Sequence, residues 1–299
     1  MRFLDPQYTV GKSLFCEAVM GKFNKVLLAS DFDNTLVYTQ GALERGEDIP
    51  PMSVRSRAAL DYFIANGGLF AVSTGRALPA FADYAKDLPC NVPCVIANGA
   101  ALYDFQRGRY LCTAFFSERI YAQMDELLER FPQLTFEVYH DDRRIHAMHP
   151  NQYVYNHEHL TRAKTQTVSD FREVDLPIIK LLFEDDRPIL DEVYAFIRSR
   201  PWSEEYELIF SSDHLLEMTA HGATKGGMVL RLADLLGVAR KDIYCVGDHL
   251  NDIPMLQIAA IGFAPENSVP EVLSCGAQIV CHCRDGAIAD VIEILDKRY

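Results

Sequence analysis

The sequence predicts a doubly wound α/β core with a parallel sheet, into which a second, α+β domain is inserted. Three observations lead to this fold class. Short apolar runs alternate with helical segments near both ends of the chain, in residues 26–98 and 224–298. All-apolar strands separated by helices are typical of a parallel sheet that is covered on both faces. In the middle of the chain, strand-like runs follow one another without helices between them, which is typical of antiparallel pairing.

The first alternating region contains three expected strands and two expected helices. Ser53 can cap a helix that runs to the stop signal Asn66-Gly67-Gly68, and a second helix is expected near 77–87. The expected strands are VLLAS (26–30), LFAVS (69–73) and CVIAN (94–98).

The same alternation returns in the last region. Thr224 can cap a helix whose apolar residues recur at helical spacing, and Gly237 can close it. Two strands, DIYCVG (242–247) and AAIGFA (259–264), and a final helix over 286–298 are expected after it.

Residues 1–100 and 220–299 are therefore assigned to the core domain, and residues 101–219 to the inserted domain. The inserted domain is expected to begin with a helix over 117–131 and a hairpin over 134–149 that turns at Asp141-Asp142. A strand over 178–184, a second helix over 188–199 and two adjacent strands over 206–211 and 215–220 are expected to follow.

Composition limits the possible functions. With 49% hydrophobic and 24% charged residues, the 299-residue chain resembles an ordinary globular protein. A net charge of −13 argues against a nucleic-acid partner, and no apolar stretch approaches the roughly 20 residues that span a bilayer. Residues 13–24 carry Glu17 within their apolar part, which fits a short surface helix better than a signal peptide. Eight scattered cysteines lack the paired spacing of a zinc site, so structural roles are expected for them. Because no secretory signal is recognised, a reducing cytoplasm is the expected location.

Chemically active side chains follow the ends of the expected core strands. Because ligands of a parallel α/β sheet bind beyond the carboxyl ends of its strands, these groups should converge. Their oxygen-rich chemistry favours Mg²⁺, and a lysine beside such a metal favours a phosphate. The groups are Asp31 and Asp33; Ser73, Thr74, Gly75 and Arg76; Asn98 and Gly99; Asp248, Asn251 and Asp252; and Lys225.

Asp31 and Asp33 stand one residue apart after a buried strand. Alternate residues of an extended segment point the same way, so the two carboxylates should share one side while Phe32 points into the packing. Two such anions repel each other unless a cation lies between them.

Four motifs carry a family resemblance. DFDNT (31–35), STGR (73–76), the lysine of GATKGG (222–227) and GDHLNDIPM (247–255) resemble the four motifs of the haloacid dehalogenase superfamily of phosphatases. Their order, their spacing and the position of the insertion resemble the Cof-type members with a type-two cap, which include sugar-phosphate phosphatases. NGA (98–100) fits the same group, and the resemblance runs from about Lys25 to the end of the chain.

The resemblance implies roles for the matching residues. Asp31 would be the nucleophile that forms an aspartyl-phosphate, and Asp33 the general acid and base. Thr74 and Lys225 would hold the phosphoryl oxygens, with Gly75 and Arg76 also at the phosphate. Pairing of Arg76 with a nearby acid is the alternative for that residue, and Asn98 is expected to fix a turn.

The resemblance also implies a Mg²⁺ site. Asp31, the backbone carbonyl of Asp33 and Asp248 would be its ligands, with Asp252 supporting the metal shell. Asn251 would touch a metal-bound water or the phosphate.

The leading hypothesis is a Mg²⁺-dependent phosphomonoester hydrolase that acts on a small phosphorylated metabolite such as a sugar phosphate. Phosphoryl transfer to a sugar, as in related mutases, and a regulatory module that kept the fold without the reaction are the alternatives. The substrate and the oligomeric state are not readable from the sequence.

Two features remain outside these motifs. The family usually has Gly where this chain has Asn34, a residue that tolerates turn conformations. The inserted domain carries five histidines, His140, His146, His149, His157 and His159. Structural or surface roles are favoured over a metal site, because His146 and His149 face opposite sides of a strand and His157 and His159 do not share a helix face. The alternative that some of them line the substrate face of the cap stays open.

Overall fold

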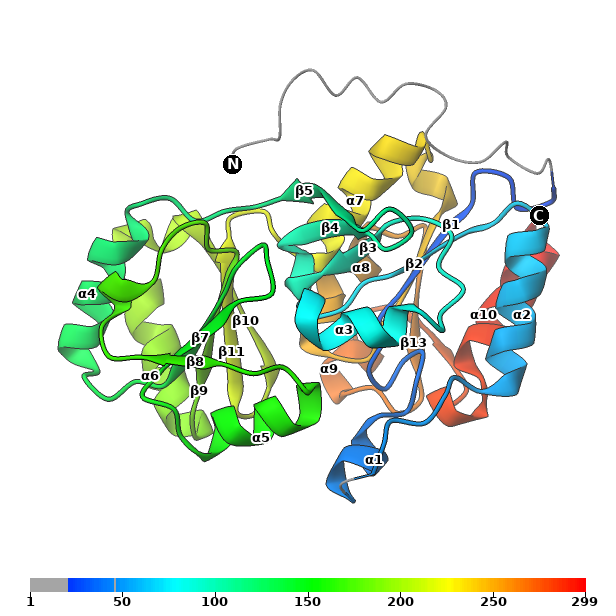
Figure 1. The fold of residues 1–299 in the computed structure, drawn as a ribbon. Coiled ribbons are helices and arrows are strands. Elements are labelled where there is room, and N and C mark those ends of the chain that lie inside the picture. Colours follow the sequence, from blue (N-terminus) through cyan, green and yellow to red (C-terminus); the bar gives the residue numbers. More distant parts are fainter. Residues whose placement is uncertain (1–20, 46) are drawn as a thin grey trace.

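The computed structural model describes residues 21–45 and 47–299, which form two domains lying side by side (Figure 1). The core domain combines the beginning and the end of the chain, and the inserted domain is its middle part, coloured mainly green. The surface helix expected in residues 13–24 lies largely outside the described residues.

The core is built on a five-stranded parallel sheet, which confirms the predicted fold class. In spatial order its strands are β14 (Gln278–Val280), β13 (Ile261–Pro265), β12 (Ile243–Val246), β1 (Leu27–Ser30) and β2 (Leu69–Val72). The expected strand at 94–98 is β3 (Cys94–Ile96), which lies beside β2 and is joined to it by a parallel bridge between Ser73 and Val95. β14 was not predicted, because two of its three side chains are exposed.

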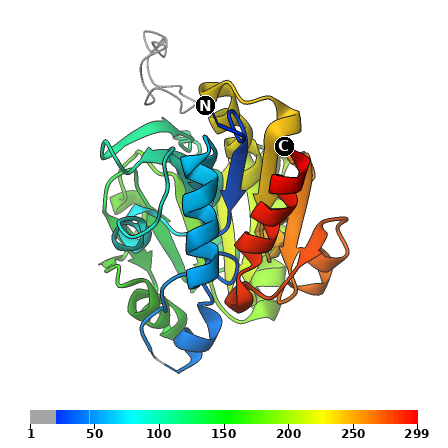
Figure 2. The same ribbon diagram turned by 90° about the vertical axis from the view of Figure 1, so that its right-hand side faces the viewer.

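Helices cover both faces of the core sheet. Leu28 packs in the apolar cluster on one face, and Leu27 and Ala29 pack in the cluster on the other, because successive residues of a strand point to opposite sides. The first face carries α2 (Val54–Ala65) and α10 (Ala287–Arg298), which lie next to each other (Figure 2), and the second carries α7 (Lys225–Leu236) and α8 (Ile253–Ile258). The shorter core helices are α1 (Gln40–Glu44), α3 (Leu78–Ala85) and α9 (Pro270–Leu273).

Two core helices begin at the predicted capping residues. The Ser53 hydroxyl accepts a 3.1 Å hydrogen bond from the Ser56 backbone N–H at the start of α2. The Thr224 hydroxyl accepts a 3.0 Å bond from the Gly227 N–H at the start of α7. Because Thr224 caps the helix, Lys225 is fixed as its first residue.

A hairpin extends the edge of the core beyond β3. β4 (Ala101–Asp104) pairs with β3 and with β5 (Arg109–Thr113), both antiparallel. Leu102 and Cys112 of this hairpin pack in the same apolar cluster as the residues of α7. The sequence prediction placed the hairpin in the inserted domain, and its packing leads us to propose a domain boundary after Thr113 instead of at residue 101.

The inserted domain, which we call the cap, contains a six-stranded sheet. In spatial order its strands are β10 (Tyr206–Ser212), β11 (Leu215–Ala220), β9 (Lys180–Glu184), β6 (Phe136–Tyr139), β7 (Ile145–Met148) and β8 (Gln166–Val168). All neighbours are antiparallel except β7 and β8. Helices α4 (Ile120–Arg130) and α6 (Arg187–Arg198) pack on one face, and α5 (Gln152–Thr161) and β8 were not predicted.

The other face of the cap sheet meets the core. Tyr139 and Leu182 of the cap share an apolar cluster with Ala77 and Ala100 of the core. The Lys180 ammonium donates a 3.2 Å hydrogen bond to the backbone carbonyl of Gly75. The cap is therefore closed over the carboxyl ends of the core strands. Among the described helices, none combines the length and the apolarity that a bilayer crossing requires.

Candidate active site

The predicted groups meet where β1, β2 and β12 end. Asp31 directly follows β1, Thr74 lies two residues beyond β2, and Asp248 lies two residues beyond β12. Phe32 is buried against Phe81 and Tyr84, so it points into the packing as expected, away from the two carboxylates.

Lys225 links two of the buried carboxylates. Its ammonium lies 2.6 Å from Asp31 Oδ1 and 2.6 Å from Asp252 Oδ1. Burial, followed by the charges of Asp252 and Asp33, raises the pKa of Asp31 to about 7, although Lys225 opposes the shift. The two carboxylates outweigh burial at Lys225 itself and raise the pKa of that ammonium, which therefore stays charged.

Asp248 and Asp252 occupy the turn after β12. Asp252 Oδ2 accepts hydrogen bonds from the backbone N–H groups of Asp248 (2.9 Å) and His249 (3.0 Å), so Asp252 shapes the turn that presents Asp248. Asp248 Oδ1 accepts a 2.6 Å bond from the Thr35 hydroxyl. Burial, and then the nearby charges of Asp31 and Asp252, raises the pKa of Asp248 well above its usual range. Thr35, a residue of the first motif, was missed as a site residue.

Asp33 is paired with Arg76. The guanidinium donates two parallel hydrogen bonds of 2.8 Å to the two oxygens of Asp33. Burial acts to raise the pKa of Asp33, but Arg76 outweighs it and the pKa lies below its usual range. Arg76 also stacks on Phe32 and Tyr84, at 5.4 and 5.1 Å from the ring centres. In this conformation Arg76 therefore holds an acid, which is the alternative role weighed for it.

Backbone turns hold the remaining motif residues close together. The buried Thr74 hydroxyl accepts a 3.1 Å bond from the Arg76 N–H, so its own hydrogen can be donated to an anion. Asn98 has a φ of 54°, as expected for a turn, and its side-chain oxygen accepts a 2.9 Å bond from Asn251. Asn98 thus also orients Asn251, which sequence reasoning did not foresee. Asn34 adopts a left-handed turn with a φ of 56°, in agreement with the tolerance expected of Asn.

Gly99 allows the helix with the lysine to approach these turns. Its φ is 98°, and a Cβ built there would lie 2.2 Å from the backbone carbonyl of Thr224. The start of α7 therefore packs directly against residues 97–99, which brings Lys225 to Asp31.

Comparison with known proteins gives this geometry a family. A family model for haloacid dehalogenase-like hydrolases matches residues 28–292. The chain belongs to the haloacid dehalogenase-like hydrolases. It is similar to two Bacillus subtilis members, the 5-amino-6-(5-phospho-D-ribitylamino)uracil phosphatase YwtE (25% identity over 270 residues, 82% of this chain and 89% of YwtE) and the phosphatase YwpJ (23% over 303 residues, 90% and 99%).

Solved structures of haloacid dehalogenase members share the fold. BT1666 from Bacteroides thetaiotaomicron superposes with a TM-score of 0.76 at 19% identity, covering 96% of this chain and 99% of BT1666. The subclass IIB sugar phosphatase BT4131 superposes with a TM-score of 0.74 at 19% identity, covering 91% and 99%. The expected family and its capped α/β fold are thus confirmed.

The acidic groups of this haloacid dehalogenase hydrolase fit a divalent cation. Oxygens of Asp31, Asp248 and Asp252 lie within 4.8 Å of one another, and all three residues are buried. When ionised, these three carboxylates leave two negative charges after pairing with the one ammonium of Lys225. An all-oxygen set with this charge suits a hard dication such as Mg²⁺. Both oxygens of Asp252 already accept hydrogen bonds, from Lys225 and from two N–H groups, so support of the shell fits it better than direct ligation.

A cavity of about 380 Å³ lies between the core of the hydrolase and its cap. Asp31, Asp33, Gly75, Asp248 and Asn251 line its core side, together with Arg76. Polar cap residues line the other side, among them Tyr139, Lys180 and Glu217, which sequence reasoning did not single out, and His157, one of the five cap histidines.

The cap residues had a sequence signal. Polar residues interrupt the apolar strands of the cap at even spacings, so that those of one strand lie on one face. They are Glu137 and Tyr139 in β6, Lys180 and Glu184 in β9, and Glu217 in β11. Lys180 and Glu217 form a buried ion pair of 3.0 Å. Charged residues at alternate positions inside apolar strands therefore marked the cavity side of the cap.

Proposed function

We propose that this hydrolase is a Mg²⁺-dependent phosphomonoesterase that works through an aspartyl-phosphate on Asp31. The observation that carries the proposal is the position of Asp31 in the cavity, where Lys225 lies 2.6 Å away and the acids for a dication surround it. The cavity volume of about 380 Å³ suits a small phosphorylated metabolite.

In the first step an oxygen of Asp31 attacks the phosphorus atom, and the bond to the leaving oxygen breaks. Asp33 donates a proton to that oxygen. In the second step Asp33 takes a proton from a water molecule that attacks the phosphorus and releases Asp31. Lys225 and Thr74 hold the phosphoryl oxygens, whose charge they stabilise in the transition state.

The pair of Asp33 and Arg76 suggests how the acid is prepared. Asp33 must gain a proton before it can donate one, and Arg76 opposes this in the present conformation. An entering phosphoryl group competes with Asp33 for the guanidinium. Loss of that pairing raises the pKa of Asp33, since burial then dominates. Arg76 would thus bind the phosphoryl group and, by leaving Asp33, allow that acid to take up a proton.

The metal would supply charge neutralisation at the phosphoryl group when bound. Asp31, the backbone carbonyl of Asp33 and Asp248 would hold it, with Asp252 behind them and Asn251 at its edge. The cap would exclude water from the transfer step and select the leaving group.

The proposal is tested with Asp31→Asn, which keeps the shape of the side chain and removes its charge. We expect hydrolysis of an aryl phosphate to require Mg²⁺ and to fall by about 10⁴-fold or more in this variant. Beryllofluoride with Mg²⁺ should form an adduct on the wild-type chain but not on Asp31→Asn. Full activity of the variant would contradict the assignment of the nucleophile.

The substrate requires a separate screen. Relatives named as 5-amino-6-(5-phospho-D-ribitylamino)uracil phosphatases and a structural neighbour named as a sugar phosphatase suggest a panel of that compound and sugar phosphates. Products separate the alternatives: inorganic phosphate indicates hydrolysis, and a new sugar phosphate indicates transfer. A folded chain that forms no beryllofluoride adduct would be the regulatory module.

The proposed location is the cytoplasm. The cysteines within the described part of the chain, seven in number, are free thiols, as a reducing compartment would leave them.

A further inference from the structure

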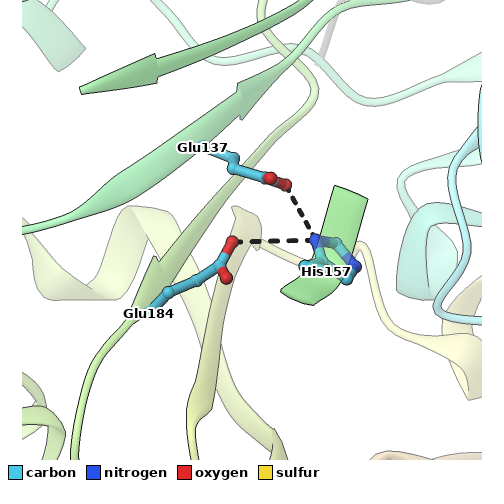
Figure 3. Close-up of side chains that lie close together, drawn as sticks. All are labelled: Glu137, His157 and Glu184. Atoms are coloured by element: carbon cyan, nitrogen blue, oxygen red, sulfur yellow. Dashed lines mark hydrogen bonds and ion pairs between the residues drawn. The ribbon is translucent and has the colours of Figure 1, made fainter. Parts of the chain in front are cut away.

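Three side chains of the cap meet beneath its cavity face (Figure 3). Glu137 comes from β6, Glu184 ends β9, and His157 lies on α5, the helix that covers them. His157 Nδ1 lies 3.0 Å from Glu137 Oε2 and 3.7 Å from Glu184 Oε1. We call these residues the cap triad.

Glu184 is the member that protein contacts do not explain. Its side chain is 0% exposed, and neither carboxylate oxygen accepts a hydrogen bond from any residue that the structure describes. Figure 3 shows its carboxylate directed at the imidazole of His157. An ionised carboxylate buried without a partner is costly, and without a cation burial and the Glu137 charge raise the pKa of Glu184 to about 10 and keep it neutral. A cation placed between Glu184 and His157 would give this carboxylate the partner that no described residue provides.

Nearby protein cations do not fill this role. Lys180 is engaged with Glu217 at 3.0 Å and with the carbonyl of Gly75 at 3.2 Å. An imidazolium at His157 would hold Glu137 within hydrogen-bond distance but would leave Glu184 beyond it. It would also leave one net negative charge on two ionised glutamates. A dication with a neutral imidazole cancels both charges.

The geometry and the donor types fit such an ion. The three ligand atoms lie within 4.8 Å of one another, and metal bonds of about 2.0–2.2 Å to N and O ligands can bridge that spread. The Tyr139 hydroxyl donates to Glu137 Oε2 and so orients this ligand from behind. One imidazole with two carboxylates favours a first-row transition-metal ion over Mg²⁺, which prefers oxygen alone.

We propose that Glu137, His157 and Glu184 form a second metal site, which binds a transition-metal dication such as Zn²⁺ and is separate from the Asp31 centre. His157 is the exposed member, at 19% against 2% for Glu137, and it lines the cavity. An open coordination position would therefore face the cavity, where an oxygen of a bound ligand or water can complete the shell. The ion would also fasten α5 to the cap sheet. The site does not depend on the proposed phosphatase reaction.

The test is Zn²⁺ binding to the full-length, chelator-treated protein by calorimetry, with excess Mg²⁺ to occupy the Asp31 centre. We expect one equivalent of Zn²⁺ that Mg²⁺ does not displace. His157→Ala and Glu184→Gln should each weaken this binding by about 100-fold. His159→Ala is the matched control, because His159 lies on the same helix and is exposed; its affinity should equal that of the wild type.

Asp248→Asn separates the two centres and should retain the tight Zn²⁺ equivalent. Loss of that equivalent in Asp248→Asn, or unchanged affinity in a folded His157→Ala, would overturn the proposal. If both triad variants fail to fold, X-ray absorption of Zn²⁺-loaded Asp248→Asn decides. One imidazole nitrogen with oxygen ligands supports the site, whereas a shell with sulfur or without nitrogen refutes it.

Discussion

Thr35 illustrates how a single uncharged residue can set the chemistry of a charged site. Its hydroxyl donates a 2.6 Å hydrogen bond to Asp248 Oδ1, and both residues are buried. This bond occupies Oδ1 of Asp248. The turn that Asp252 holds fixes the direction of the other oxygen. Outer groups that orient a metal-binding carboxylate in this way commonly control its affinity.

Replacing Thr35 by Val removes this hydroxyl and keeps the shape of the side chain. We expect the Mg²⁺ concentration for half-maximal activity to rise by about 10-fold or more, because Asp248 loses its orienting bond. Thr35→Ser keeps the hydroxyl and should stay near the wild type. Measurement of the rate against Mg²⁺ concentration checks the prediction, and equal curves for Thr35→Val and Thr35→Ser would contradict it.

The raised pKa of Asp31 predicts competition between protons and Mg²⁺. A folded-state value of about 7, above the ordinary 3.8, means that Asp31 is protonated at pH 5 and ionised at pH 8 in the metal-free protein. In that range the folded state holds more protons than the unfolded state, so ionisation of Asp31 lowers the stability of the metal-free protein as the pH rises. A dication removes this cost.

The apparent affinity for Mg²⁺ should therefore fall by at least about tenfold for each pH unit below 7, because the pKa of Asp248 is raised as well. The increase in Tm on adding Mg²⁺ should be large at pH 8 and small at pH 5. Calorimetry in buffers of different ionisation enthalpy should show proton release on binding near pH 6. A Tm increase that does not change between pH 5 and pH 8 would refute the assignment of Asp31 as a ligand.

At the scale of elements, the junction between residues 97–99 and the start of α7 holds the lysine at the site. Gly99 permits the contact, both by its φ of 98° and by the space that its missing side chain leaves. Gly108 has a positive φ as well, 63°, but a Cβ there would meet nothing within 4 Å. Substitutions at Gly99 and Gly108 therefore distinguish the cost of backbone strain, which both would have, from the cost of disturbing the close contact, which only Gly99 would have.

We predict that Gly99→Ala lowers the free energy of unfolding by about 3 kcal/mol, since the Cβ must push α7 away from the turn. Gly108→Ala should cost only about 1 kcal/mol, the strain alone. Denaturant unfolding measures both, and activity should fall only in Gly99→Ala because Lys225 moves with its helix. Equal losses of stability would contradict the role of the contact.

The elements differ in how well the sequence predicted them. β1, β2 and β12 were predicted because they are short and apolar, and the turns that carry the motifs follow directly from their ends. α5 was missed because only Val154 of its ten residues is buried, so no apolar face appears in the sequence. The role of His157 was hidden for the same reason, since its partners come from distant strands.

At the scale of the molecule, Lys180 joins the two domains. It connects Glu217 on β11 to the Gly75 carbonyl in the core, and its ammonium lies over the Tyr139 ring, 4.5 Å from the ring centre. The sequence could not predict this contact, because it requires the placement of the cap on the core. The core site was predictable because the topology of a parallel sheet brings its strand ends together.

Lys180→Met should destabilise the protein by about 3 kcal/mol, because Glu217 is left buried without its cation. The double variant Lys180→Met/Glu217→Gln should recover most of this loss, since no buried charge remains. Both variants lack the contact to Gly75, so both should show a larger radius of gyration in X-ray scattering than the wild type. If the double variant has the radius of gyration of the wild type, Lys180 does not hold the cap on the core.

The route of the chain between the domains adds a mechanical consequence. β11 ends at Ala220 and α7 begins at Lys225, so four residues separate the cap sheet from the helix that carries the lysine. The Thr219 hydroxyl donates 2.8 Å to the Ala223 carbonyl and tightens this passage further. The passage is thus short and internally hydrogen-bonded. A rotation of the cap would therefore be transmitted to the peptide that leads into Lys225. Insertion or deletion of a residue in 221–224 would change both the position of the cap and the position of the lysine.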